Sequence, residues 1–300
     1  MRKPAVMLIA VSLIWGASFM FIKVADRQLA PATLIMGRLG LAALTLALVA
    51  PFAVGARRTL DALRADAGWL VVVALVNTAA PFWLLSWGET KIDSGLASII
   101  QASVPIFNAA IAFGFFREAR VTGVRLAGVA IGFVGVALLV GAQPSGKILG
   151  AVAVVGMALG YALGGLLMSR HLRATPPIVI SLASTAIAAV VALPAGIAQL
   201  PHATPGWKEI GSVVALGVPG TALAYLLFFA LITNAGPSYA VLVTYLIPPI
   251  ALAYGAIFLG ERFGAVAFAG LALVLAGVTL GTGVRIASGR VRRASARQPL

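Results

Sequence analysis

Two stretches of equal length decide the fold: residues 78–118 read TAAPFWLLSWGETKIDSGLASIIQASVPIFNAAIAFGFFRE, and residues 221–261 read TALAYLLFFALITNAGPSYAVLVTYLIPPIALAYGAIFLGE. They align without a gap after a shift of 143 residues, and the matches include a mid-helix proline and a terminal glutamate. Self-similarity at a fixed separation indicates an internal duplication. We therefore predict two related halves, residues 1–142 and 143–284, followed by a basic tail at residues 285–300.

The composition around these stretches indicates a membrane protein. Hydrophobic residues make up 61% of the chain and charged residues 10%, whereas a soluble domain carries about 25% charge. A spanning helix needs about 20 mostly apolar residues. We predict an all-α integral membrane protein with ten transmembrane helices, over residues 4–22, 33–54, 69–87, 96–116, 126–140, 148–169, 178–200, 210–232, 240–259 and 263–283.

The basic residues between these runs predict the orientation. With the N-terminus inside, 15 Lys and Arg residues fall in inside segments and 6 in outside segments. Cytoplasmic loops carry the excess of positive charge. We expect both termini in the cytoplasm. The net charge of +14 then reflects topology rather than a nucleic-acid partner. Because each half holds five helices, the second half should be inverted relative to the first.

Acidic residues do not form a recognisable reaction centre in the sequence. All eight lie at the ends of the apolar runs or in loops, and no metal-ligand spacing, nucleotide loop or catalytic triad is present. We therefore expect no enzyme activity, no metal and no cofactor. An inverted repeat is the architecture of many secondary transporters. Because no paired-acid site is visible, we expect such transport to occur without obligatory proton exchange.

Polar and aromatic residues inside the apolar runs are the candidate substrate ligands. Mid-membrane amides and hydroxyls need partners, and seven-residue spacing places Gln101 and Asn108 on one helix face. Helix–helix hydrogen bonding is the alternative role for the amides, and simple packing for the aromatics. The candidate binding residues are Trp15, Asn77, Phe82, Trp83, Gln101, Asn108, Tyr161, Thr221, Tyr225, Thr244 and Tyr245.

Three further residues have expected roles. Pro105 and Pro248 free backbone carbonyls, so we expect hinges there. Arg38 is the charged residue inside a run, and two roles stay open for it. It is a candidate contact for an anionic group such as a carboxylate, or a structural arginine that binds a neighbouring helix and snorkels outward from its shallow position.

Several motifs resemble the EamA family of the drug/metabolite transporter superfamily, including bacterial amino-acid exporters of the YddG type. They are Ile14-Trp-Gly-Ala-Ser-Phe near the start, Ala222-Leu-Ala-Tyr225, Ala235-Gly-Pro-Ser, and Leu259-Gly-Glu-Arg262 with Pro248 upstream. The resemblance implies ten helices in two inverted repeats and a central cavity lined by the first, third, fourth, sixth, eighth and ninth helices.

The sequence and the resemblance together predict a secondary transporter. We expect it to export small organic metabolites, foremost amino acids including aromatic ones, by alternating access. Its partners would be a small-molecule substrate and the lipid bilayer, with the chain a monomer or weak homodimer. The alternatives are a drug or nucleotide-sugar carrier, and, from another class, a non-transporting membrane scaffold or lipid-modification partner.

Overall fold

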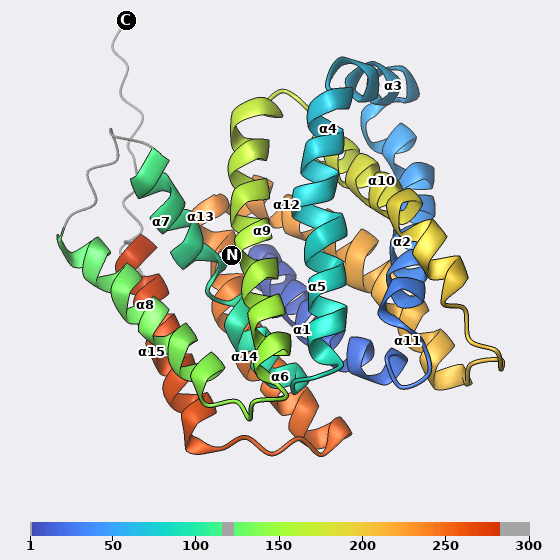
Figure 1. Cartoon of the computed structure of the whole chain (residues 1–300). Helices are drawn as coiled ribbons and strands as arrows, with labels where there is room; N and C mark the ends of the chain where they lie inside the picture. The colour runs from blue at the N-terminus through green and yellow to red at the C-terminus, as the bar shows by residue number, and fades with distance from the viewer. Residues whose placement is uncertain (1, 116–122, 283–300) are drawn as a thin grey trace, which may run out of the picture.

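The protein folds as a bundle of long apolar helices (Figure 1). The structure is a computed structural model and describes residues 2–115 and 123–282. No strand occurs in this described part, so the all-helical membrane fold is confirmed. Five spans in the first two thirds of the chain are single helices, and the first four are α1 (Arg2–Ala25), α2 (Pro31–Val54), α8 (Gly123–Gly141) and α9 (Ile148–His171).

The other spans are α10 (Pro177–Ala198) and several interrupted helices. The third span joins α4 (Ala67–Val73), the π-helical segment η1 (Ala74–Ala79) and α5 (Ala80–Glu89), and the fourth joins α6 (Ser94–Gln101) and α7 (Val104–Phe115). The eighth span joins α11 (Trp207–Gly217), the π segment η2 (Val218–Leu223) and α12 (Ala224–Ala235). The ninth joins α13 (Pro237–Ala240), α14 (Leu242–Tyr254) and η3 (Gly255–Leu259).

Nine of the described helical segments are long and apolar enough to cross a membrane. The tenth predicted span corresponds to α15 (Ala265–Thr282), whose apolar part, Ala265–Gly281, is shorter. Large apolar side chains face outward, where a bilayer rather than water would surround them. On α2, for example, Leu44, Leu48 and Phe52 follow one another at four-residue spacing, and Phe52 is 91% exposed.

One segment between two spans differs from the expectation of a polar break. Residues 56–65 form the helix α3 (Ala56–Ala65) at the end of the bundle. Its arginines alternate with apolar residues at helical spacing, so one face packs inward while the other stays polar. Ala62 and Leu63 pack against the cluster that contains Leu46 and Ile178.

Two helix pairs form opposite flanks of the bundle. In Figure 1, α8 and α15 run side by side at the left, while α2 and α10 lie at the right. Hydrogen bonds from the Thr33 hydroxyl to the carbonyls of Gly196 and Gln199, at 2.9 and 3.0 Å, join α2 to α10. Between the flanks, α1 packs against α14 and α5 packs against α9. The cavity described below lies among these central helices.

Candidate functional site: a cavity between the central helices

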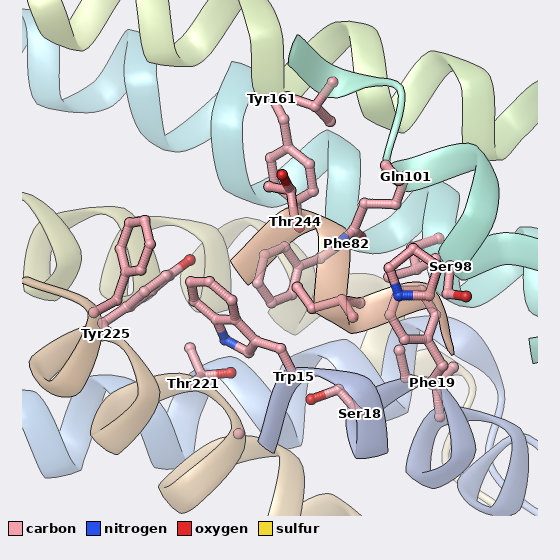
Figure 2. Close-up of a pocket in the computed structure, with 18 of the residues that line it drawn as sticks. Trp15, Ser18, Phe19, Phe82, Ser98, Gln101, Tyr161, Thr221, Tyr225 and Thr244 are labelled. Atoms are coloured by element: carbon pink, nitrogen blue, oxygen red, sulfur yellow. The ribbon is translucent and has the colours of Figure 1, made fainter. Parts of the chain in front are cut away.

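A cavity of about 300 Å³ lies within the central part of the bundle. Pockets for small organic ligands begin at about this size. Figure 2 shows side chains from several spans converging on it. Ten of the fourteen residues singled out in the sequence line it: Trp15, Arg38, Asn77, Phe82, Gln101, Tyr161, Thr221, Tyr225, Thr244 and Pro248.

The π-helical segments place two of the polar ligands. Asn77 lies in η1 and Thr221 lies in η2. A π turn inserts one residue into a helix and changes the direction of the side chains that follow. The Thr221 hydroxyl donates to the Leu216 carbonyl, five residues earlier, at 2.8 Å. Gly220 is required beside it, because a Cβ there would lie 2.8 Å from the Ala215 carbonyl oxygen.

Arg38 supplies the positive charge of the cavity. It is 5% exposed, and its Nε donates to the Thr221 hydroxyl at 3.0 Å. Its guanidinium carbon lies 4.4 Å from the centre of the Phe82 ring, a cation–π contact. Among residues 2–115 and 123–282, no other charged side chain lines the cavity. The side chain stays buried on the cavity wall, so the outward snorkelling of the structural alternative is wrong.

Aromatic rings cover much of the remaining wall. Trp15 packs edge-on against Tyr225 at 6.3 Å between ring centres and lies 5.1 Å from Phe228. Phe82 packs edge-on against Tyr161 at 6.4 Å. Rings held in this way present rigid apolar faces and, at the tyrosines, hydroxyl groups.

Several polar groups in the cavity are available to a ligand. Within the described part of the chain, the side-chain amides of Asn77 and Gln101 form no hydrogen bond with protein. The Thr244 hydroxyl, by contrast, donates to the Val241 carbonyl at 2.7 Å. Both amides are half-buried and line the cavity, so their donors and acceptors are accessible to a ligand there.

Four predicted site residues lie away from the cavity. Trp83 is 46% exposed and stacks on Trp87, because it follows Phe82 by one position and so points about 100° around the helix. Tyr245 contacts Thr279 of α15 through their hydroxyls, at 3.5 Å. Asn108 is exposed and Pro105 is the second residue of α7.

The expectation that Gln101 and Asn108 share a face is wrong. Seven-residue spacing places two side chains on one face only within a continuous helix. Here α6 ends at Gln101 and α7 begins at Val104. The backbone between them forms a turn in which Ser103 bonds to Ile100, so the two amides diverge.

Sequence reasoning missed several lining residues, among them Ser18, Phe19, Ser98 and Phe228. Ser18 lies three residues after Trp15, and Ser98 lies three residues before Gln101. Both therefore share a helix face with a predicted ligand, which was an available signal. Phe19 and Phe228 lie in strongly apolar helices and gave no signal distinct from packing.

A glutamate ends each of the two repeated stretches, Glu118 in the first and Glu261 in the second. The Glu261 carboxylate accepts hydrogen bonds from the Ser94 amide at 2.8 Å, the Ser94 hydroxyl at 2.9 Å and the Gly95 amide at 3.2 Å. It therefore caps the N-terminus of α6. Glu118, its counterpart in the first half, lies outside the described residues.

Comparison with known proteins identifies the family. The sequence model of the EamA-like transporter family matches residues 2–141 and again residues 148–282. The chain belongs to this family. The EamA-like chain is 27% identical over 290 residues to a protein of Streptantibioticus cattleyicolor named "Probable terminal-alkyne amino-acid exporter", covering 89% of each chain. It is also 27% identical to an uncharacterised transporter of Archaeoglobus fulgidus, over 93% of this chain and 98% of that one.

A solved crystal structure shares the fold of this EamA-like protein. The two superpose with a TM-score of 0.65 over 94% of this chain and 97% of the other, at 17% sequence identity. At this identity the likeness concerns the fold alone. The family and these relatives make the chain a multi-pass membrane transporter, and a small-molecule substrate and the surrounding lipid are its partners.

Proposed function

We propose that this EamA-like transporter exports amino acids or closely related small metabolites, including aromatic ones. The observation that carries the proposal is the single buried guanidinium of Arg38 in a cavity that also presents unpaired amides, tyrosine hydroxyls and aromatic rings. An amino acid presents one carboxylate, one ammonium and one side chain, and the cavity offers a complement to each.

Arg38 is the proposed carboxylate ligand. Its Nε is bound to Thr221, and within the described residues its two terminal nitrogens have no hydrogen-bond partner. A guanidinium presents its donors in a planar fork that matches a carboxylate. The contact with Phe82 holds the group in place, which lowers the entropy lost on binding.

The ammonium and side chain of the substrate have their own partners. The amide oxygens of Asn77 and Gln101 and the hydroxyls of Tyr161 and Tyr225 accept hydrogen bonds from an ammonium group. Trp15 offers an apolar face for an aliphatic or aromatic side chain. The name of the Streptantibioticus relative, an amino-acid exporter, supports the same substrate class.

Alternating access between two inverted halves, residues 1–142 and 143–284, is the proposed mechanism. The family model matches twice, once in each half, which supports a duplication. The π segments lie at corresponding places, since η1 begins at Ala74 and η2 at Val218. The flanking pairs α2–α10 and α8–α15 each join one half to the other, as repeat-related helices would. Pro105 and Pro248 are the proposed hinges.

The proposed location is the bacterial inner membrane with both termini in the cytoplasm. A nucleotide sugar would need several cations for its phosphates, and Arg38 is the cation of the described cavity. Lys23, the other candidate, donates to the backbone carbonyls of Glu89 and Ile92 outside the cavity. An amino-acid substrate therefore fits the charges better than a nucleotide sugar does.

Counterflow in proteoliposomes tests the proposal. Purified protein would be reconstituted in vesicles loaded with unlabelled amino acid, and entry of the labelled form would be measured for phenylalanine, leucine, threonine and lysine. We expect flux for at least one neutral amino acid and none for its carboxamide. Flux of a nucleotide sugar or a cationic dye in the same vesicles, without amino-acid flux, would overturn the proposal.

A further inference from the structure

Two acids at one end of the bundle, Asp26 and Glu89, have buried carboxyl oxygens and lie outside the cavity. Glu89, the last residue of α5, is 0% exposed, and neither of its carboxyl oxygens has a hydrogen-bond partner in the described part of the chain. Asp26 follows α1, and its Oδ1 accepts a hydrogen bond from Ser86 at 3.1 Å while its Oδ2 has no partner there. Ser86 and Glu89 are one helical turn apart, so the two carboxyl groups face the same region.

No ion pair neutralises these two acids among the described residues. The ammonium of Lys23 donates instead to the backbone carbonyls of Glu89 and Ile92, the latter at 2.7 Å. The charges of Asp26, Lys23, Glu261 and Arg38 all act on Glu89. Glu261 is bound to Ser94 and Gly95, and Arg38 to Thr221. A buried carboxyl without a cation or donor is stable only with a proton on it.

The position of the pair connects the substrate cavity with the outside of the bundle. Ile22 and Leu85 line the cavity, and Lys23 and Glu89 follow them on the same two helices. On the other side, Lys23, Asp93 and Glu261 line a second, open hollow. The end of the bundle that holds this hollow also contains Asp26, Glu89, Ser94 and Glu261, and we call it the Glu261 end. The two acids therefore lie in the protein layer that separates the cavity from the hollow.

We propose that Asp26 and Glu89 form a proton-binding site that keeps the Glu261 end closed while protonated, so that transport is coupled to protons. Loss of the proton breaks a carboxyl O–H bond and passes H⁺ to water in the cavity while the cavity is open to the opposite side, leaving a buried carboxylate beside a second acid. That charge is better solvated when the end opens. Once the Glu261 end has opened, the carboxylate takes up the next proton from water in the hollow, so each cycle carries one proton across the protein. The inference replaces our expectation of proton-independent transport, and its coupling step rests on the proposed function.

The pKa of Asp26 shifts in the direction that the proposal requires. Burial raises the pKa of Asp26 from 3.8 to about 7, against the smaller opposing effects of the Ser86 hydrogen bond and the Lys23 charge. A raised pKa means that the closed state binds more protons than a state in which the carboxyl is hydrated. The closed state is therefore favoured at low pH and loses this advantage as pH rises from about 4 to about 7.

A cysteine-labelling experiment tests the site without any substrate. The chain has no cysteine, so Ile92→Cys introduces a single reporter at a fully buried position of the Glu261 end. A membrane-impermeant maleimide would be applied from that side at a series of pH values. At each pH, the labelling rate of Ile92→Cys would be divided by the labelling rate of the double variant Ile92→Cys/Glu89→Gln. This division cancels the pH dependence of the thiol itself. We expect this ratio to rise on the order of tenfold per pH unit below the titration point.

Matched variants assign the effect to the pair. Glu209→Gln removes another buried acid, 6% exposed, in the first turn of α11 at the same end, and should keep the wild-type response. Glu89→Asp keeps a titratable group and should keep a pH response, and Asp26→Asn should weaken it. A flat ratio, or equal effects of the Glu209 and Glu89 substitutions, would overturn the proton site. If Glu89→Gln does not fold, a pH response unchanged by Asp26→Asn would overturn it as well.

Flux measurements separate this inference from the proposed function. In vesicles with an imposed pH gradient, we expect concentrative amino-acid uptake by the wild type and only equilibration by Glu89→Gln. A pH-dependent labelling ratio without flux of any amino acid would contradict the substrate class while supporting the proton site. Amino-acid flux that ignores the pH gradient in both proteins would support the substrate class and overturn the coupling.

Discussion

Arg38 lies about a third of the way along α2, where a charge is costly unless it has partners. It has two, the Thr221 hydroxyl and the Phe82 ring, and both come from other spans. These contacts hold the guanidinium on the cavity wall while leaving donors for a ligand. At the scale of the single residue, the site is thus organised by a cation fixed in a low-dielectric wall and by amides that lack protein partners.

Arg38→Gln should selectively weaken binding of ligands that carry a carboxylate. A hydrogen bond to a charged group is worth about 1.5–3 kcal/mol, so the affinity for an amino acid should fall about 10- to 150-fold. The affinity for its carboxamide should change little. Equilibrium dialysis with both labelled ligands measures the two affinities. An unchanged ratio between acid and carboxamide would show that Arg38 has only a structural role.

Gln101→Leu tests the amides in the same way. The change removes a donor and an acceptor while keeping similar bulk, so we expect apparent affinity to fall about 10- to 150-fold if Gln101 binds the charged groups of the substrate. Asn108→Leu is the matched control, because that amide is exposed away from the cavity. Transport would be normalised to the amount of protein in the membrane. Reduced amount with unchanged affinity would place Gln101 in the packing instead.

Individual elements are ended and joined by specific local contacts. The Leu259-Gly-Glu-Arg262 motif is an example: Gly260 has φ +69°, a left-handed conformation that ends η3 and turns the chain back toward α6. Gly255 makes room for the returning Glu261, since a Cβ there would lie 2.3 Å from its Oε2. The motif therefore caps the N-terminus of α6, a helix of the other half.

Glu261→Ala should destabilise the fold through loss of this cap. Three hydrogen bonds at the N-terminus of α6 disappear, and we expect a loss of about 1–3 kcal/mol. Thermal unfolding in detergent, followed by the helical circular-dichroism signal, measures it. Glu261→Gln should lose less, because one acceptor oxygen remains. Asp61→Ala on the exposed face of α3 is the control, and an equal melting temperature for all three would refute the capping role.

The glycine stripes of α8 and α15 face each other within one chain. A Cβ at Gly277 would lie 2.5 Å from the Gly132 Cα, and one at Gly128 would lie 2.3 Å from the Gly281 amide nitrogen. In both cases the obstacle is backbone, which cannot rotate away. These small residues allow two helices to approach closely, as in other membrane bundles.

Gly277→Ala should therefore lower stability by about 1–3 kcal/mol through overpacking. Gly141→Ala is the matched control, because a Cβ there meets nothing within 4 Å and alanine favours a helix. Melting temperatures in detergent provide the comparison, and light scattering gives the oligomeric state. A change from dimer to monomer at unchanged melting temperature would mean that the stripe serves association between chains.

At the scale of the whole molecule, we expect each half to cross the membrane an odd number of times. The two halves would then have opposite orientations in the membrane. A reporter fused after Leu300 should be cytoplasmic, and one inserted in the loop of residues 202–207 should be periplasmic, because basic residues concentrate on one side. Paired alkaline phosphatase and fluorescent-protein fusions report the two sides. Both fusions on the same side would exclude the inverted arrangement of the halves.

The sequence by itself determined the class of fold and half of the residues that line the cavity. Long apolar runs with little charge have few alternatives to membrane helices, since the backbone must satisfy its own hydrogen bonds in lipid. Polar residues within those runs, such as Asn77 and Gln101, face the cavity because lipid offers them no partner. These features follow from the composition and from the spacing of apolar residues along the chain, so the sequence alone is enough to predict them.

Only the tertiary structure decided which side chains meet. The break between α6 and α7 separates Asn108 from Gln101, and a single helical step turns Trp83 away from the cavity. Asp26 and Glu89 are 63 positions apart and each lies at a helix end, where a solvated acid is the ordinary expectation. Their burial depends on α1 packing against α5, and such contacts arise from the packing of whole helices rather than from the residues that flank each acid.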